Sequence, residues 1–161
     1  MLDPLVIEPL TAVAFQSFGE VLEVKPQPTV MINEGRCARY SDLAQVEFLE
    51  ARAGISVFKA QLSQLPFHLR MMERHPLGSQ AFIPMSCDPF LVIVAQSQWD
   101  TPKHIKAFIT DGKQGVNYLR NTWHAVLTPL SGDGLFTVVD RIGDGSNLEE
   151  CWFDEPFEVR Y

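Results

Sequence analysis

Apolar residues along this chain come in short groups, and their spacing changes near Gly54. Before that point the spacing is helical in two places. Thr11 is placed to cap a short helix over residues 11–18. Ser41 or Asp42 is placed to cap a second helix, because leucine and valine then recur three residues apart. The pattern predicts one or two short helices near the N-terminus.

After Gly54 the apolar residues alternate with polar ones, or form runs of a few residues bounded by proline, glycine and aspartate. Short runs bounded in this way are typical of β-strands. Many short strands with turns at regular intervals predict a sandwich or a barrel. The predicted strands comprise residues 55–62, 67–73, 80–85, 89–96, 106–110, 114–119, 125–130 and 135–141.

The length and composition fit one globular domain over residues 1–161. Hydrophobic residues make up 46% of the chain and charged residues 20%, as in ordinary folded domains. The longest apolar run, residues 90–95, is far shorter than the roughly 18 residues of a membrane span. The N-terminus has no basic segment and does not resemble a secretory signal. We expect no membrane partner.

The net charge is −7 and lysines and arginines are not clustered, which argues against a nucleic-acid partner. Three widely spaced cysteines make an odd number, which favours reduced thiols in a cytoplasmic protein over a disulfide framework.

Candidate chemistry is concentrated in residues 73–80. On an extended segment Glu73 and His75 share one face while Arg74 points to the other. Gln80 follows a turn and opens the next strand, which can return it beside them, and His124 stands just before a later predicted strand. Each residue alone is most simply a surface or packing residue. Together they predict a ligand or metal site, because a polar cluster inside a small barrel usually marks one.

The order Glu73, His75, Gln80 and His124 is similar to the ligand order of cupins, with altered ligand types. Longer strings resemble the ureidoglycolate lyase family, formerly called ureidoglycolate hydrolase. They are ERHPLGSQAFIPM (73–85), KAFIT (106–110), GVNY (115–118), WH (123–124), TVVDR (137–141) and RYSDLA (39–44).

The resemblance implies an all-β, cupin-type double-stranded β-helix barrel that forms a cytoplasmic homodimer. It implies a carbon–nitrogen lyase of the amidine-lyase type. The reaction would split (S)-ureidoglycolate into glyoxylate and urea during allantoin (purine) degradation. It further implies that a divalent metal such as nickel stimulates the enzyme and that no organic cofactor is needed.

Two uses of the histidines stand open at this point. His75 and His124 suit a general acid–base pair, with Glu73 orienting one of them or acting as the base. Alternatively Glu73, His75 and His124 hold a divalent metal that lowers the pKa of the substrate hydroxyl. Gln80 is a neutral and weak ligand, so any ion should be loosely bound.

The substrate carboxylate needs a nearby cation in this acidic protein. The candidates are Arg74, Lys59, Lys106 and Arg141. Tyr118 and Gln80 are candidates to hydrogen-bond the urea moiety.

Two other classes of protein compete with the lyase. A non-catalytic cupin-like module binding a small anion or a carbohydrate would need no titrating pair of histidines. A metal-dependent oxygenase would need three strong ligands with open positions.

Overall fold

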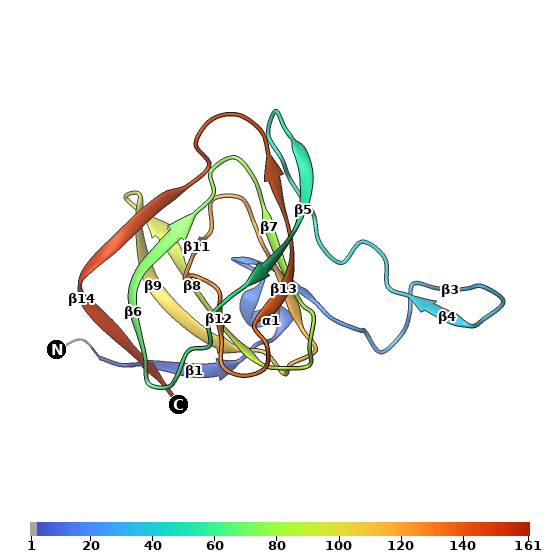
Figure 1. The fold of residues 1–161 in the computed structure, drawn as a ribbon, viewed down its shortest axis with the longest axis horizontal. Coiled ribbons are helices and arrows are strands. Elements are labelled where there is room, and N and C mark those ends of the chain that lie inside the picture. The colour runs from blue at the N-terminus through green and yellow to red at the C-terminus, as the bar shows by residue number, and fades with distance from the viewer. Residues whose placement is uncertain (1–2) are drawn as a thin grey trace.

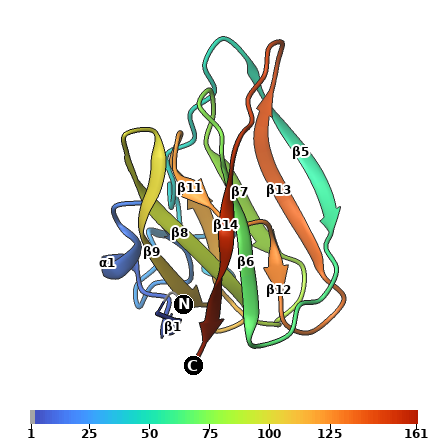
Figure 2. The ribbon, with the colours of Figure 1, turned by 90° about the vertical axis from the view of Figure 1, so that its left-hand side faces the viewer.

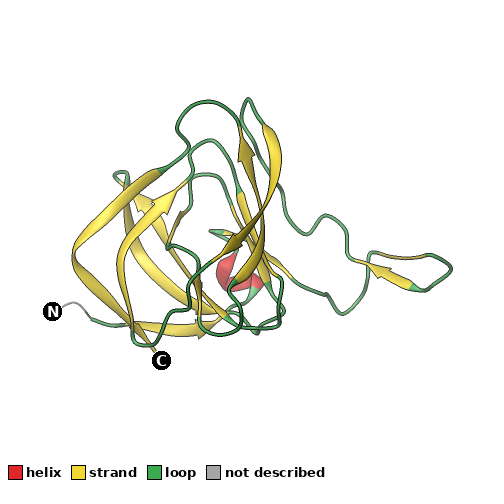
Figure 3. Ribbon diagram, in the orientation of Figure 1, coloured by secondary structure: helices red, strands yellow, loops and turns green. Residues whose placement is uncertain are grey.

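The computed structural model describes residues 3–161, and most of its regular structure is β-sheet (Figure 1 and Figure 3). The strands are β1 (Leu5–Pro9), β2 (Gly19–Leu22), β3 (Val30–Ile32), β4 (Cys37–Arg39), β5 (Arg52–Lys59), β6 (Phe67–Arg74), β7 (Gln80–Pro84), β8 (Phe90–Gln98), β9 (Thr101–Ile109), β10 (Gly115–Tyr118), β11 (Trp123–His124), β12 (Thr128–Pro129), β13 (Leu135–Ile142) and β14 (Glu149–Arg160).

Within residues 3–161 there is one helix, α1 (Ala12–Phe15), and it confirms the first predicted helix in a shorter form. The hydroxyl of Thr11 caps it by accepting a bond of 3.2 Å from the amide of Ala14. The second predicted helix is wrong, because residues 41–51 follow an irregular path. Backbone bonds to the segment before β7 hold that path, including Ser79 N to Glu47 O at 2.9 Å. These tertiary bonds outweigh a weak helical preference.

Six strands form a closed, mixed barrel in the order β11-β6-β14-β1-β9-β8, because β11 pairs with both β6 and β8. Five strands form a second sheet in the order β2-β10-β7-β13-β5. Figure 2 shows β5, β7 and β13 along one side of the barrel. The prediction of an all-β, cupin-type barrel is confirmed. Strands β1 to β4, β11 and β14 were outside the predicted set.

The apolar residues form two cores that explain the long apolar run of β8. Ile93 and Ala95 pack inside the closed barrel with Trp123. Val92 and Val94 point the opposite way and pack between the barrel and the five-stranded sheet. Because β8 is buried on both faces, its sequence reads as continuously apolar rather than alternating.

Two further features of the fold are a close contact between β2 and β10 and a projecting arm. A Cβ at Gly19 would meet the carbonyl oxygen of Asn117, so glycine allows β2 to lie against β10. Strands β3 and β4 pair with each other and form an arm that projects from the body (Figure 1). No helix in residues 3–161 is long and apolar enough to cross a membrane.

Candidate functional site

Glu73, His75 and His124 come together on the barrel face that looks toward the five-stranded sheet. Glu73 and His124 are directly paired between β6 and β11. The Glu73 Oε1 atom lies 4.0 Å from His75 Nε2 and 4.0 Å from His124 Nδ1. One ligand atom from each residue lies within 4.8 Å of the others. The predicted convergence of these three side chains, called here the Glu–His group, is confirmed.

Backbone carbonyls fix both imidazole rings. His75 Nδ1 lies 2.6 Å from the carbonyl oxygen of Asn147, and His124 Nδ1 lies 3.0 Å from that of Ala125. A carbonyl only accepts, so each Nδ1 carries a proton and each neutral ring has its lone pair on Nε2. Both Nε2 atoms are buried without a hydrogen-bond partner. They are therefore available to a substrate or a metal.

The five-stranded sheet supplies the opposite wall. The Tyr118 ring stacks on His124 with centroids 4.3 Å apart and planes inclined by 2°. Gln80 faces Tyr118 across the β7–β10 pair and is buried. Its amide Nε2 donates to Asp140 Oδ2 at 3.3 Å. Tyr118 thus contacts His124 of the Glu–His group, Gln80 is the neighbour of Tyr118 on the next strand, and Asp140 bonds to Gln80.

Burial dominates the electrostatics of the site. It lowers the pKa of His124 to about 3, with His75 adding to the effect and the Ala125 carbonyl opposing it. Burial also raises the pKa of Glu73, while His75 lowers it and Glu150 raises it further. The pKa of the Tyr118 phenol is raised by burial and then by Glu73. His124 is therefore neutral near pH 7.

Because the pKa of His124 is depressed in the folded state, the stability that its neutral ring provides is present above about pH 6.5 and lost as the pH falls toward 3. In that interval the unfolded chain binds one more proton at this residue. We expect the free energy of unfolding to fall by at most about 1.4 kcal/mol per pH unit from this residue. In His124→Phe the free energy of unfolding, measured with urea, should change less between pH 7 and pH 4.5 than in the wild type.

The matched control is His68→Phe, which removes an exposed imidazole from β6. It should leave the slope as in the wild type. An unchanged slope in His124→Phe would show that another group carries the acid sensitivity.

Arg74 does not contact the Glu–His group. Its side chain lies on the opposite face of β6, as strand alternation predicted, over the ring of Trp123 at 4.6 Å. It donates to Glu149 at 2.6 Å and to Asp100 at 3.2 Å. A buried guanidinium must be paired, and these acids pair it. Arg74 thus has a structural pairing, and its binding of substrate stays a prediction.

The other predicted cations have contacts outside the Glu–His group. Arg141 donates to the carbonyl oxygens of Leu49 and Asp144 at 2.9 and 3.0 Å. Lys106 lines a separate surface pocket of about 200 Å³ with Glu8. Lys59 is exposed at the end of β5. That Lys106 or Arg141 holds the substrate carboxylate stays a prediction.

Sequence reasoning missed Asn147 and Asp140. Asn147 lies before β14 and holds the His75 region twice, through its carbonyl and through its side chain, which accepts from Leu77 N at 2.7 Å. No local sequence pattern predicts these contacts, which join residues 70 and 72 positions apart. Asp140 could have been found, because alternation along β13 places it on the same face as the buried Val138.

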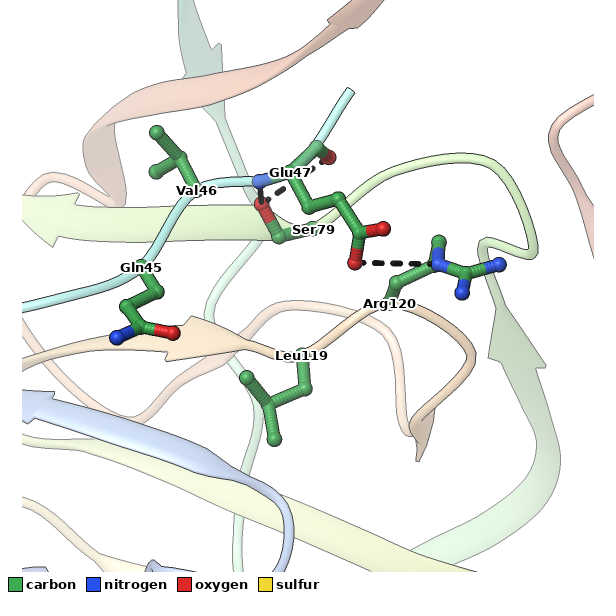
Figure 4. A pocket seen from close by; sticks show the side chains of 6 residues that line it. All are labelled: Gln45, Val46, Glu47, Ser79, Leu119 and Arg120. Atoms are coloured by element: carbon green, nitrogen blue, oxygen red, sulfur yellow. Dashed lines mark hydrogen bonds and ion pairs between the residues drawn. The ribbon is translucent and has the colours of Figure 1, made fainter. Parts of the chain in front are cut away.

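A surface pocket of about 470 Å³ lies behind the strands that carry Gln80 and Tyr118. Figure 4 shows Ser79 and Leu119 facing it, with Arg120 paired to Glu47 at 3.2 Å. Neighbouring residues on an extended chain point to opposite sides, so these side chains face away from the Glu–His group.

The Glu–His group has the composition of a metal site. Two imidazoles and a carboxylate suit a divalent transition metal, and the two unpartnered Nε2 atoms are the donors such an ion needs. Ligand atoms around such an ion lie about 3 Å apart, closer than the 4.0 Å between Glu73 Oε1 and His75 Nε2. The residues present fit a divalent metal.

Comparison with known proteins gives concordant matches over the whole chain. A model described as ureidoglycolate lyase matches residues 2–160. The ureidoglycolate lyase of Rhodobacter capsulatus is 52% identical over 159 residues, covering 98% of this chain and 99% of its own. That of Chelativorans sp. is 49% identical, covering 96% and 95%. Ureidoglycolate lyase 2 of Rhizobium meliloti is 48% identical, covering 98% of each.

Proposed function

The chain belongs to the ureidoglycolate lyase family, and we propose that it is an enzyme that splits (S)-ureidoglycolate into glyoxylate and urea in allantoin degradation. The observation that carries the proposal is the convergence of Glu73, His75 and His124 beside Tyr118. Such a reaction makes it a carbon–nitrogen lyase of the amidine-lyase type. A module that only binds an anion or a carbohydrate would not need this group.

The reaction is an elimination from one carbon atom, which carries the hydroxyl, the carboxylate and the ureido nitrogen. A base removes the hydroxyl proton, and the O–H electron pair forms the aldehyde C=O bond. The C–N bond breaks, and its electron pair takes a proton from an acid to complete urea. The step needs one base and one acid near the substrate, each typically contributing 10²–10⁴-fold.

Glu73 and His75 are the pair best placed for these proton transfers. Burial raises the pKa of Glu73, which makes it a stronger base than an exposed carboxylate. His75 Nε2 lies 4.0 Å from Glu73 and has no other partner. When the ring carries a second proton, that proton is on Nε2, because Nδ1 already donates to Asn147, and it is placed for transfer to the leaving nitrogen. His124 is neutral near pH 7 and offers a lone pair rather than a proton.

We also propose that Glu73, His75 and His124 can bind a divalent metal such as nickel. When bound, such an ion would supply positive charge for the substrate oxygens and lower the pKa of the hydroxyl. The buried atoms without partners at this site are imidazole nitrogens and side-chain oxygens, which can bind a cation. The nearby arginines, Arg74 and Arg141, are bonded to other groups. In that state the three side chains act as ligands rather than proton carriers.

We propose a cytoplasmic homodimer built from this single domain. The outer face of the five-stranded sheet exposes apolar side chains, including Ile55 at 78% and Val57 at 63%. An isolated two-stranded hairpin such as the β3–β4 arm is at best marginally stable in water. A second copy covering both features would remove apolar surface from water. The three free thiols suit a reducing compartment.

The test of the proposed function is the identity of its products. Incubation with ureidoglycolate should release glyoxylate and urea in equal amounts. Ammonia formed along with glyoxylate, two molecules for each, with no urea, would contradict the lyase and indicate hydrolysis at the urea carbonyl.

A further inference from the structure

Two buried oxygen atoms near the Glu–His group have no hydrogen-bond donor. They are Gln80 Oε1 and Asp140 Oδ1. Gln80 as a residue is only 6% exposed. Buried oxygens without a donor are uncommon and costly in folded proteins, and they point to a ligand that supplies the missing donors.

Strand alternation brings both residues to the space between the sheets. Phe136 and Val138 of β13 are buried in the core between the sheets, and Asp140 is the next residue on that face. Gln80 bonds to Asp140 from β7 and faces Tyr118 on its other side. Tyr118 in turn stacks on His124. Contacts therefore run without a break from Asp140 to the Glu–His group.

Asp140 also fixes which way the Gln80 amide points. An ionised carboxylate only accepts, so the amide must turn its NH₂ toward Asp140, where Nε2 lies 3.3 Å from Oδ2. The amide oxygen then points away from Asp140. The pair consequently presents two oxygen acceptors to a ligand.

Such a pair selects one end of ureidoglycolate. The substrate carboxylate would be repelled by these oxygens, whereas the terminal NH₂ of the ureido group offers two donors. We propose that Gln80 and Asp140 bind this NH₂ and so determine specificity for the ureido group. The inference rests on the proposed function, which it deepens by assigning the substrate's orientation.

The test compares two non-reactive ligands that differ at that one group. N-carbamoylglycine is the substrate without its hydroxyl, and N-acetylglycine has CH₃ in place of the terminal NH₂. A site built to bond a donor rejects the analogue that lacks it. By titration calorimetry we expect wild-type protein to bind N-carbamoylglycine about tenfold or more tightly than N-acetylglycine. In Asp140→Asn the ratio should fall below about threefold, because Gln80 is no longer fixed.

Asp144→Asn is the matched control, since it makes the same change at an exposed position four residues away. It should keep the wild-type ratio. The inference is overturned if the wild type binds both ligands with equal affinity or binds neither. It is also overturned if Asp140→Asn keeps the wild-type ratio of affinities. If Asp140→Asn does not fold, Gln80→Met removes one of the same acceptors and should also reduce the ratio.

These ligands are not cleaved, so the result is independent of catalysis. A preference that depends on Asp140, in a protein that releases no glyoxylate from ureidoglycolate, would refute the proposed reaction and leave the ureido-binding pair standing. Glyoxylate release by a protein that shows no such preference would support the proposed reaction and refute the ureido-binding pair.

Discussion

Replacing His75 by alanine is expected to lower kcat/KM for ureidoglycolate by about 10²-fold or more, the usual size of a lost general acid. The Nε2 atom of His75 is the proton donor in the proposed elimination, and no other imidazole near Glu73 is both unpartnered and less than fully buried. The measurement is steady-state release of glyoxylate by the purified variant.

His68→Ala is the control for the His75 variant, because it removes an exposed imidazole from the same part of the chain. It should stay near wild-type activity. The His75 variant should keep the melting temperature within a few degrees, since its ring lies at the end of β6 rather than in either apolar core. A folded His75→Ala protein with kcat/KM within about threefold of wild type would remove His75 from the chemistry.

Glu73→Gln is expected to have an effect at least as large, about 10²-fold or more in kcat/KM. The amide keeps the shape of the side chain but neither accepts the hydroxyl proton as a base nor brings a negative charge to a metal. A second measurement, calorimetric titration with Ni²⁺, should show weaker binding than in the wild type. Loss of activity with unchanged Ni²⁺ binding would assign Glu73 to proton transfer alone.

Glu150→Gln is the matched control for Glu73, because Glu150 faces Glu73 across the β6–β14 pair and is exposed. It contributes to the raised pKa of Glu73. Its replacement should change activity little and should leave Ni²⁺ binding intact. Wild-type activity in Glu73→Gln would contradict its assignment both as base and as ligand.

The strands of the second half of the chain could be predicted because their pattern is local. Apolar residues alternate with polar ones at the start of β6 and form short runs in β7 and β13, and turns of proline, glycine and aspartate separate these strands. β14 was missed because its alternation is interrupted: its pairing with β6 shifts between Trp152 and Phe157. An irregularity of this kind breaks a pattern of period two.

The site was predictable to the extent that strand alternation governs it. The two-residue spacing of Glu73 and His75 placed them on one face and Arg74 on the other, as found. Which basic side chain binds the substrate carboxylate was not predictable from the sequence. The charge of Arg74 alone does not reveal that it is paired with Glu149. That pairing joins residues 75 positions apart and depends on where β14 runs.

The most direct test of the lyase is a count of nitrogen products. The protein is incubated with (S)-ureidoglycolate, glyoxylate is followed over time, and free ammonia is measured before and after urease is added. The account predicts no ammonia until urease acts, and then two molecules of ammonia for each glyoxylate. Ammonia that appears without urease, in step with glyoxylate, would contradict it.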